Sequence, residues 1–132
     1  MKTKIILDTN FLLIPAQFRV DIFSEIRGVC DFNYELVVVA ETIAELKKII
    51  ASGRSGGRDK KAAKLALQLL RKYGVRVLKN YRKVFKRADD AILDIADKKS
   101  LVATQDRELK RALQAKCGLI ILRQKQYLQI CE

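Results

Sequence analysis

Leu36-Val37-Val38-Val39 is the stretch that decides the fold, because it is an uninterrupted apolar run that leads directly into a helical pattern. Continuous β-branched runs of this length are typical of strands buried on both faces of a parallel sheet. The helical pattern covers residues 41–51 and places Ile43, Leu46 and Ile50 on one face. This segment therefore predicts a buried strand followed by the helix that covers it.

The same alternation of strand and helix continues on both sides of this unit. Short apolar runs predict further strands, and apolar residues at helical spacing predict helices between them. The pattern predicts an α/β fold, a three-layer α/β/α sandwich with a central parallel sheet of about five strands. The predicted strands are residues 4–7, 36–39, 75–78, 101–104 and 119–122, and the predicted helices are residues 20–29, 41–51, 59–73, 88–98 and 106–115.

Single residues predict where some of these elements begin and end. Pro15 predicts a kink or an end in a short helix within residues 11–16. Asp59 is expected to cap the helix that follows the glycine-rich loop at residues 52–58, and Gly74 is expected to end it. The residues after 122 carry no pattern that assigns them to a helix or a strand.

Length and composition indicate the class of protein. A chain of 132 residues with 49% hydrophobic residues predicts one globular domain, residues 1–132. Its apolar stretches are too short to span a bilayer, and the N-terminus lacks the pattern of a secretory signal. Cys30, Cys117 and Cys131 are scattered without a CxxC pair, which suits reduced thiols. We therefore expect a cytoplasmic protein without a membrane partner.

The chain contains no histidine. This excludes Ser-His-Asp and Cys-His catalysis, proton relays through imidazole and zinc sites with histidine ligands. Any chemistry must therefore depend on carboxylates, lysines, arginines, hydroxyl groups or a hard metal ion.

Positive charge is concentrated in the middle third of the chain, and the net charge is +12. Residues 46–88 contain 15 of the 27 Lys and Arg residues and one acidic residue, Asp59. The other acidic residues lie in residues 1–45 and 89–132. A block this basic predicts a surface that binds a polyanion, and a well-solvated pair of helices is the alternative.

Carboxylates recur where the predicted strands end. In a parallel α/β sheet the functional crevice lies at the carboxyl ends of the strands, so we expect these acids to lie close together. Clustered acids repel one another unless a cation neutralises them, and an all-oxygen cluster favours Mg²⁺ or Mn²⁺. Asp8 follows the first strand, Glu45 lies in the helix after the second, Asp89 and Asp90 open the helix after the third, and Asp106 follows the fourth.

Each of these acids also has a local structural explanation. Asp8 is a typical turn residue, Asp106 is well placed to cap a helix, Asp89 complements a helix dipole, and Glu45 is within reach of neighbouring lysines. Taken singly, Asp106, Asp89 and Glu45 are each better explained by these local roles. Their joint recurrence at strand ends favours a common site.

Helix geometry distinguishes Asp89 from Asp90. The apolar residues of the predicted 88–98 helix form one arc, and Asp89 lies at its margin. Asp90 points away from the arc, on the side of Asp94 and Asp97. We therefore predict that Asp89 is the ligand and that Asp90 tunes the site or binds a second ion.

These motifs, in this order, resemble those of the PIN-domain nucleases, and the resemblance covers essentially the whole chain. The start at residues 8–13, the Ala-Asp-Asp helix opening and the Thr-Gln-Asp-Arg-Glu-Leu segment most resemble the branch that cleaves precursor ribosomal RNA in small-subunit maturation. They resemble the VapC toxin branch less, and the short form suggests an archaeal source. The resemblance rests on Asp8-Thr9-Asn10, Thr42-Ile43-Ala44-Glu45-Leu46, Ala88-Asp89-Asp90-Ala91-Ile92-Leu93 with Ala96, and Thr104-Gln105-Asp106.

The resemblance implies a metal-dependent endoribonuclease that uses one or two Mg²⁺ or Mn²⁺ ions and leaves a 5′-phosphate and a 3′-hydroxyl. The doubled Asp89-Asp90 departs from the family pattern, although Ile92 and Ala96 fit best when counted from Asp89. By this resemblance the catalytic acids and metal ligands are Asp8, Glu45, Asp89 and Asp106, with Asp90 as a further ligand and with Asn10 and Thr104 as groups that orient them.

The predicted RNA contacts lie in the basic middle third. Tyr73 and Tyr81 are candidates for stacking on a base, and a place in the core is an equally strong alternative for Tyr73. The expected partner is precursor ribosomal RNA or a pre-ribosomal particle, and a homodimer is frequent in the family. The predicted phosphate contacts are Arg54, Arg58, Lys60, Lys61 and Lys64, followed by Arg82, Lys83, Lys86 and Arg87.

Three other functions compete with this interpretation. The first is a VapC-type toxin ribonuclease that an antitoxin protein inhibits. The second is an inactive PIN-like RNA-binding factor of ribosome assembly, against which the intact acids argue. The third is a response-regulator-like domain, which needs a phosphoacceptor aspartate on a central strand and a lysine after the last strand, and neither is evident.

Overall fold

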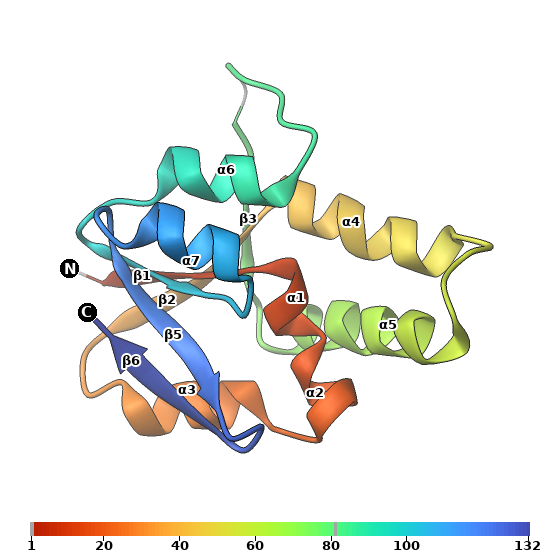
Figure 1. Ribbon diagram of the computed structural model, residues 1–132, viewed down its shortest axis with the longest axis horizontal. Coiled ribbons are helices and arrows are strands. Elements are labelled where there is room, and N and C mark those ends of the chain that lie inside the picture. The colour runs from red at the N-terminus through yellow and green to blue at the C-terminus, as the bar shows by residue number, and fades with distance from the viewer. Residues whose placement is uncertain (1, 81) are drawn as a thin grey trace.

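The computed structural model describes residues 2–80 and 82–132 (Figure 1). Each of the five predicted strands is present, with ends shifted by one or two residues. No helix in these ranges is long and apolar enough to cross a membrane. The elements are β1 (Thr3–Leu7), α1 (Thr9–Leu12), α2 (Ile14–Phe18), α3 (Ile22–Val29), β2 (Tyr34–Val39), α4 (Ala40–Ala51), α5 (Gly57–Lys72), β3 (Arg76–Leu78), α6 (Ala88–Ile95), β4 (Ser100–Ala103), α7 (Arg107–Leu113), β5 (Gly118–Arg123) and β6 (Tyr127–Cys131).

The strands form one sheet in the order β3-β2-β1-β4-β5-β6. β1 to β5 are parallel, and β6 runs antiparallel to β5. The prediction of about five strands is therefore corrected to six, because the unassigned C-terminal segment adds an edge strand. Its hairpin turn was hard to recognise, because Gln124 and Lys125 hold the left-handed positions that Asn and Gly usually occupy.

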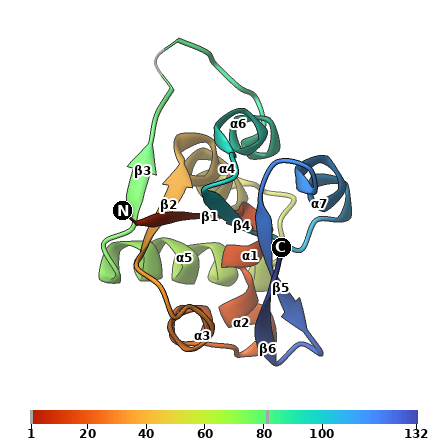
Figure 2. The same ribbon diagram turned by 90° about the vertical axis from the view of Figure 1, so that its left-hand side faces the viewer.

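Helices cover both faces of the sheet, which confirms the three-layer architecture (Figure 2). Along β1 the side chains alternate between two cores. Ile5 and Leu7 pack with α1, α2, α3 and α5, and Ile6 packs with α6 and α7. This double burial explains why the strands read as continuous apolar runs.

Some helix ends differ from the prediction. α5 begins at Gly57 with Gly56 in the capping position, so Asp59 lies in its first turn and is not the cap. A carboxylate there still interacts favourably with the helix dipole, which is why the two roles are hard to separate by sequence. Gly74 follows the helix with φ +59°, as expected for a residue that ends it. Near Pro15 the helix is interrupted as predicted, since Leu13 separates α1 from α2.

Tyr73 belongs to the core side of the molecule. Its ring stacks on that of Phe23, with the ring centroids 4.2 Å apart and the planes 8° from parallel. This contact supports the core alternative over base stacking for Tyr73. Tyr81, the other tyrosine predicted to stack on a base, lies outside the described residues.

The site is positioned by the junction between β1 and β4. Successive strands are added on one side of β1, in the order β1, β2, β3, and then on its other side, in the order β4, β5, β6. A crevice opens in such sheets at the carboxyl ends of the two strands where the direction changes. Leu7 pairs with Ala103 in this register, so the next residues, Asp8 and Thr104, lie side by side.

Candidate active site

Asp8 is the buried centre of the site, with a relative exposure of 2%. It caps α1, where its Oδ1 accepts a hydrogen bond from the Thr9 backbone N–H at 2.8 Å. Its Oδ2 accepts a hydrogen bond from the Thr104 hydroxyl at 2.7 Å. The carboxylate is therefore fixed between β1 and β4 by one local and one long-range contact.

The surroundings of Asp8 disfavour its negative charge. Burial is the main reason that the pKa of Asp8 rises from 3.8 to about 6, and the carboxylates of Asp89 and Asp106 raise the pKa further. The hydrogen bonds from Thr104 and Thr9 oppose this rise. A raised pKa caused by burial together with like charge is typical of functional carboxylates.

Glu45 links three helices at the same edge. From the second turn of α4, its Oε1 accepts a hydrogen bond from the Thr9 hydroxyl at 2.7 Å, and its Oε2 accepts one from the Ala88 backbone N–H at 2.8 Å. Glu45 therefore satisfies the first N–H of α6, although it lies 43 residues earlier in the chain. This contact excludes the alternative in which Glu45 faces solvent and pairs with neighbouring lysines.

Asp89 faces the cluster, and Asp90 does not. Asp89 is half-buried, and its pKa is raised first by burial and then by the charge of Asp106, with Glu45 and Asp90 adding to the effect. The Arg87 guanidinium lies 2.9 Å from Asp89 Oδ2 and lowers the pKa of that carboxyl. Asp90 is exposed on the outer side of α6. The helical arc places Asp89 on the side of the other acids, in agreement with the influence of Asp106 and Glu45 on its pKa, and its role as a ligand stays a prediction.

Asp106 and Thr104 complete the cluster from β4 and α7. Asp106 caps α7 through a hydrogen bond from the Leu109 backbone N–H to its Oδ1, at 3.1 Å. The Thr104 hydroxyl accepts a hydrogen bond from the Asp106 backbone N–H at 3.0 Å while it donates to Asp8. Thr104 thus connects the two aspartates, as predicted for a group that orients them.

Asn10 lies near the acids without contacting them. Its side chain is exposed and lines a small cavity beside the site. The group that orients Glu45 is instead the hydroxyl of Thr9, which is buried at 6% exposure. The Asp-Thr-Asn motif contains this residue, but nothing in the motif favours the threonine over the asparagine, because the contact with Glu45 joins residues 36 positions apart.

The chemistry of these donors fits a hard divalent cation. All of them are carboxylate oxygens, and those of Asp8 and Glu45 each accept one hydrogen bond and keep a second acceptor position. As the side chains stand, no three acidic or cysteine residues of the described ranges converge closely enough to hold one ion. One of the donors, Asp89 Oδ2, is at present paired with the guanidinium of Arg87.

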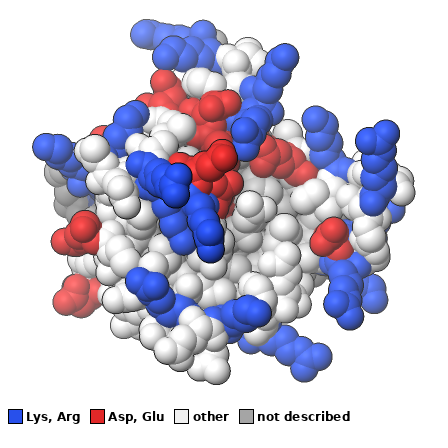
Figure 3. All heavy atoms as spheres, in the orientation of Figure 1, with Lys and Arg blue, Asp and Glu red and all other residues white. Residues whose placement is uncertain are grey.

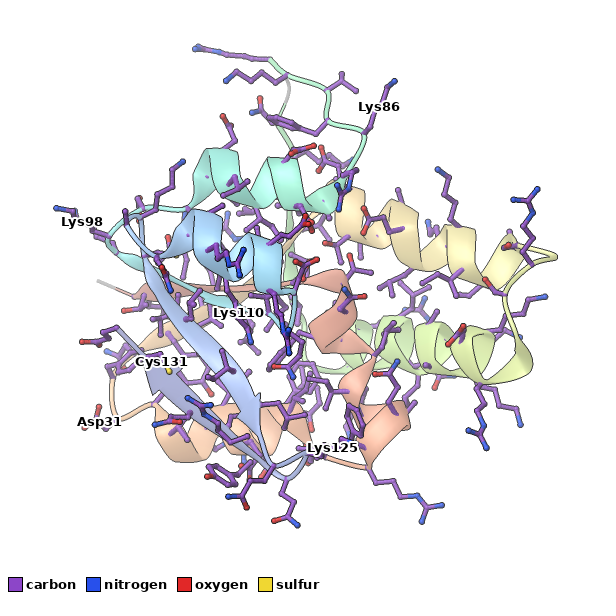
Figure 4. All side chains as sticks on the ribbon, in the orientation of Figure 1. Asp31, Lys86, Lys98, Lys110, Lys125 and Cys131 are labelled. Atoms are coloured by element: carbon purple, nitrogen blue, oxygen red, sulfur yellow. The ribbon has the colours of Figure 1, made fainter. Side chains whose placement is uncertain are left out.

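Basic side chains surround this acidic centre. Figure 3 shows the acidic atoms in the middle of the face, with lysines and arginines above them and toward the tip of α4 and α5. Of the nine predicted phosphate contacts, Lys83 pairs with Asp94 at 3.1 Å and Arg87 pairs with Asp89. The other seven form no ion pair with any residue in 2–80 or 82–132. Figure 4 shows Lys86 projecting from the loop before α6.

The fold and the site define an α/β/α domain with one buried and three partly buried acids at the carboxyl ends of the strands. Beside them lies a basic margin, formed by the α4–α5 turn with the start of α5 and by the loop before α6. Residues 5–125 match the family described as PIN like domain, and the chain belongs to this family. The resemblance stated from the motifs is thereby confirmed.

Two individual proteins are similar to the chain. Ribonuclease VapC4 of Methanocaldococcus jannaschii is 33% identical over 131 residues, which cover 96% of this chain and 95% of the relative. The structure of the PIN domain endonuclease Utp24 matches with a TM-score of 0.76 and 23% identity, covering 96% of this chain and 90% of that chain. The second similarity confirms the fold.

The raised pKa of Asp8 predicts an unusual pH dependence of stability in the metal-free protein. Between pH 3.8 and about 6 the folded state binds more protons than the unfolded state, so the free energy of unfolding falls as pH rises through this window. Above about pH 6, the ionised carboxylate of Asp8 should lower the free energy of unfolding by about 3 kcal/mol. Asp8→Asn should remove this cost and be more stable than the wild type above about pH 6, with no difference below about pH 4.

Urea unfolding in EDTA across this pH range measures the effect. Asp97→Asn is the control, because hydrogen bonds from Ser100 and the Lys99 N–H lower the pKa of Asp97. This control should lose stability at neutral pH. An Asp8→Asn variant less stable than the wild type at pH 7 would contradict the prediction.

Proposed function

We propose that this protein is a metal-dependent endoribonuclease that hydrolyses RNA phosphodiester bonds in the cytoplasm. The observation that carries the proposal is the placement of Asp8, Glu45, Asp89 and Asp106 at the same edge of the sheet, on four separate strand–helix units. These acids are close enough to raise the pKa of Asp8 and of Asp89. Membership of the PIN-like family and the similarity to a protein named as a ribonuclease support it.

In this mechanism the four carboxylates would hold one or two Mg²⁺ or Mn²⁺ ions. When bound, such ions lower the pKa of a water molecule and stabilise charge on the phosphate and the leaving oxygen. Thr104 fixes Asp8 and the start of α7 relative to each other, and Thr9 and the Ala88 N–H fix Glu45. The chain has no imidazole to support a metal-free route through the ribose 2′-hydroxyl.

The basic margin supplies the attraction that brings RNA to an acidic site. Arg54 and Arg58 lie on the α4–α5 turn and the start of α5, and Arg82 and Lys86 lie on the loop before α6. The phosphate backbone of RNA binds such surfaces with a strong dependence on salt. The charges therefore hold the polyanion on both sides of the carboxylates.

Two substrates remain candidates for this activity. The Ala-Asp-Asp and Thr-Gln-Asp motifs favour precursor ribosomal RNA. The 33% identity to Ribonuclease VapC4 favours a toxin ribonuclease with an antitoxin protein as its partner. We infer that the ribosomal precursor is the first candidate. The Ala-Asp-Asp and Thr-Gln-Asp motifs include residues of the site itself, whereas the identity to Ribonuclease VapC4 is spread over the whole chain.

Asp89 and Asp90 offer a matched pair for testing catalysis. Asp89→Asn should lower metal-dependent cleavage of a structured RNA by more than about 100-fold, because loss of even an outer partner of a metal ligand costs up to that factor. Asp90→Asn should stay within about threefold of the wild type, because an exposed charge is screened by solvent. Cleavage is measured on a precursor-rRNA fragment with Mn²⁺ or Mg²⁺ and with EDTA. Equal activity of the wild type and Asp89→Asn would refute the assignment, and RNA binding without any cleavage would favour the inactive assembly factor.

The basic margin predicts a change in the salt dependence of binding. The double variant Arg54→Gln/Arg58→Gln should bind RNA more weakly and lower the slope of log K against log salt by about 1 to 2. Arg76→Gln is the matched control, because Arg76 is paired with Glu35 at 2.8 Å on the edge strand β3. Fluorescence anisotropy in EDTA at several salt concentrations measures both slopes. An unchanged slope in the double variant would remove these arginines from the RNA surface.

Expression in a bacterial host distinguishes the two substrates. A ribosomal-precursor nuclease should leave growth unaffected and cut a structured precursor-rRNA fragment at a defined position. Growth arrest by the wild type, absent with Asp89→Asn, would instead establish the toxin function.

A further inference from the structure

A small cavity opens beside the acidic cluster, with a volume of about 280 Å³. Two of its residues adjoin the site in sequence, since Asn10 lies two positions after Asp8 and Gln105 directly precedes Asp106. The cavity is therefore built in part by residues that flank two of the acids in the chain, at the same edge of the sheet. Its lining residues are Asn10, Ile14, Gln17, Phe18 and Gln105.

The lining combines an aromatic ring, an apolar side chain and three amides, with no charged residue among them. A nucleobase has the same combination of surfaces, because its flat faces stack on aromatic rings and its edges carry donors and acceptors. Gln105 Oε1 already accepts a hydrogen bond from the Leu122 N–H at 2.9 Å, which fixes this side chain and leaves its NH₂ group to donate. The cavity thus offers both apolar surface and groups that form hydrogen bonds.

Lys125 adds a positive charge beside Phe18, one of the residues that line the cavity. Its ammonium lies 5.6 Å from the centroid of the Phe18 ring, and Figure 4 shows it at the hairpin tip beside α2. A cation in this place can meet the phosphate that accompanies a base.

The backbone next to Phe18 has an unusual conformation. In the described parts of the chain, three residues other than glycine have positive φ: Arg19 at 55°, Gln124 at 53° and Lys125 at 56°. Arg19 directly follows Phe18, and the other two form the hairpin turn that brings Lys125 over its ring. Positive φ is uncommon and unfavourable for such residues, and strained positions of this kind cluster at binding sites. Glycine would relieve the strain at Lys125 but would remove its ammonium.

We propose that this cavity binds one unpaired nucleobase of the RNA, next to the phosphate held at the acidic cluster. The base stacks on Phe18, and the amides of Asn10, Gln17 and Gln105 read its edge. This proposal rests on the proposed ribonuclease function and extends it, because it places a specificity-determining subsite outside the carboxylates.

The test compares two probes of equal length and charge in EDTA: a single-stranded decaadenylate RNA and a ten-unit abasic ribose-phosphate chain. Because both carry the same phosphates, the ratio of their affinities reports the contribution of the bases. The wild type should bind the RNA about tenfold more tightly than the abasic chain, as expected for stacking of one base. Phe18→Leu should reduce this ratio to about twofold or less, because leucine keeps the apolar contact and loses the aromatic face.

Phe32→Leu is the matched control. Phe32 is 36% exposed and Phe18 is 37% exposed, and Phe32 lies beside Thr3 and Ser100, at the opposite end of the strands. This variant should keep the wild-type ratio. Lys125→Gly should lower affinity for the RNA without lowering the melting temperature, since glycine accepts the left-handed turn.

The outcomes separate the subsite from the proposed function. An equal ratio in the wild type and Phe18→Leu, with both probes still bound, would overturn the base subsite and leave the ribonuclease intact. A wild type that binds neither probe at low salt would refute RNA binding itself, and with it both proposals.

Discussion

The hydrogen bond between the Asp8 carboxylate and the Thr104 hydroxyl is the interaction on which the site depends. It joins the ends of β1 and β4 at the switch point of the sheet, over a separation of 96 residues. The same hydroxyl accepts from the N–H of Asp106 and so orients the start of α7. One threonine therefore sets the relation between two carboxylates that would otherwise repel each other.

Gathering acids at this edge is unfavourable for the isolated fold. Asp8 is almost fully buried, and the pKa values of Asp8 and Asp89 are both raised by burial and by neighbouring negative charges. Arg87 relieves part of this repulsion at Asp89 through an exposed ion pair. Exposed ion pairs contribute little, so the compensation for the repulsion among the acids is partial. This unrelieved repulsion is the physical basis for expecting a cation there.

The continuous apolar runs predicted the sheet well, because those of β1, β2, β4 and β5 fill two cores at once. β6 was missed because Gln124 and Lys125 occupy a turn whose usual residues are Asn and Gly. The rule that function lies at strand ends selected the four acids, and helical spacing separated Asp89 from Asp90. Sequence patterns did not show that Glu45 caps α6 or that Thr9 orients Glu45, because both contacts join elements far apart in the chain. Local propensity carries no information about such contacts.

The separation of charge along the chain has a physical reason in the fold. An RNA phosphate approaching four carboxylates is repelled, so attraction must come from cations that lie beside the acids and do not neutralise them. The two basic segments are the α4–α5 turn and the loop before α6, and each is joined to a helix that carries one of the acids, Glu45 or Asp89. Lys83 and Arg87 form ion pairs, while Arg54, Arg58 and Lys86 are exposed on either side of the centre. Within these two segments only Lys83 and Arg87 form ion pairs with acids of the described residues, and of these two acids only Asp89 belongs to the site. The positive charge therefore lies beside the acidic centre and leaves most of it unneutralised, which is what the proposed binding of both a phosphate and a metal ion requires.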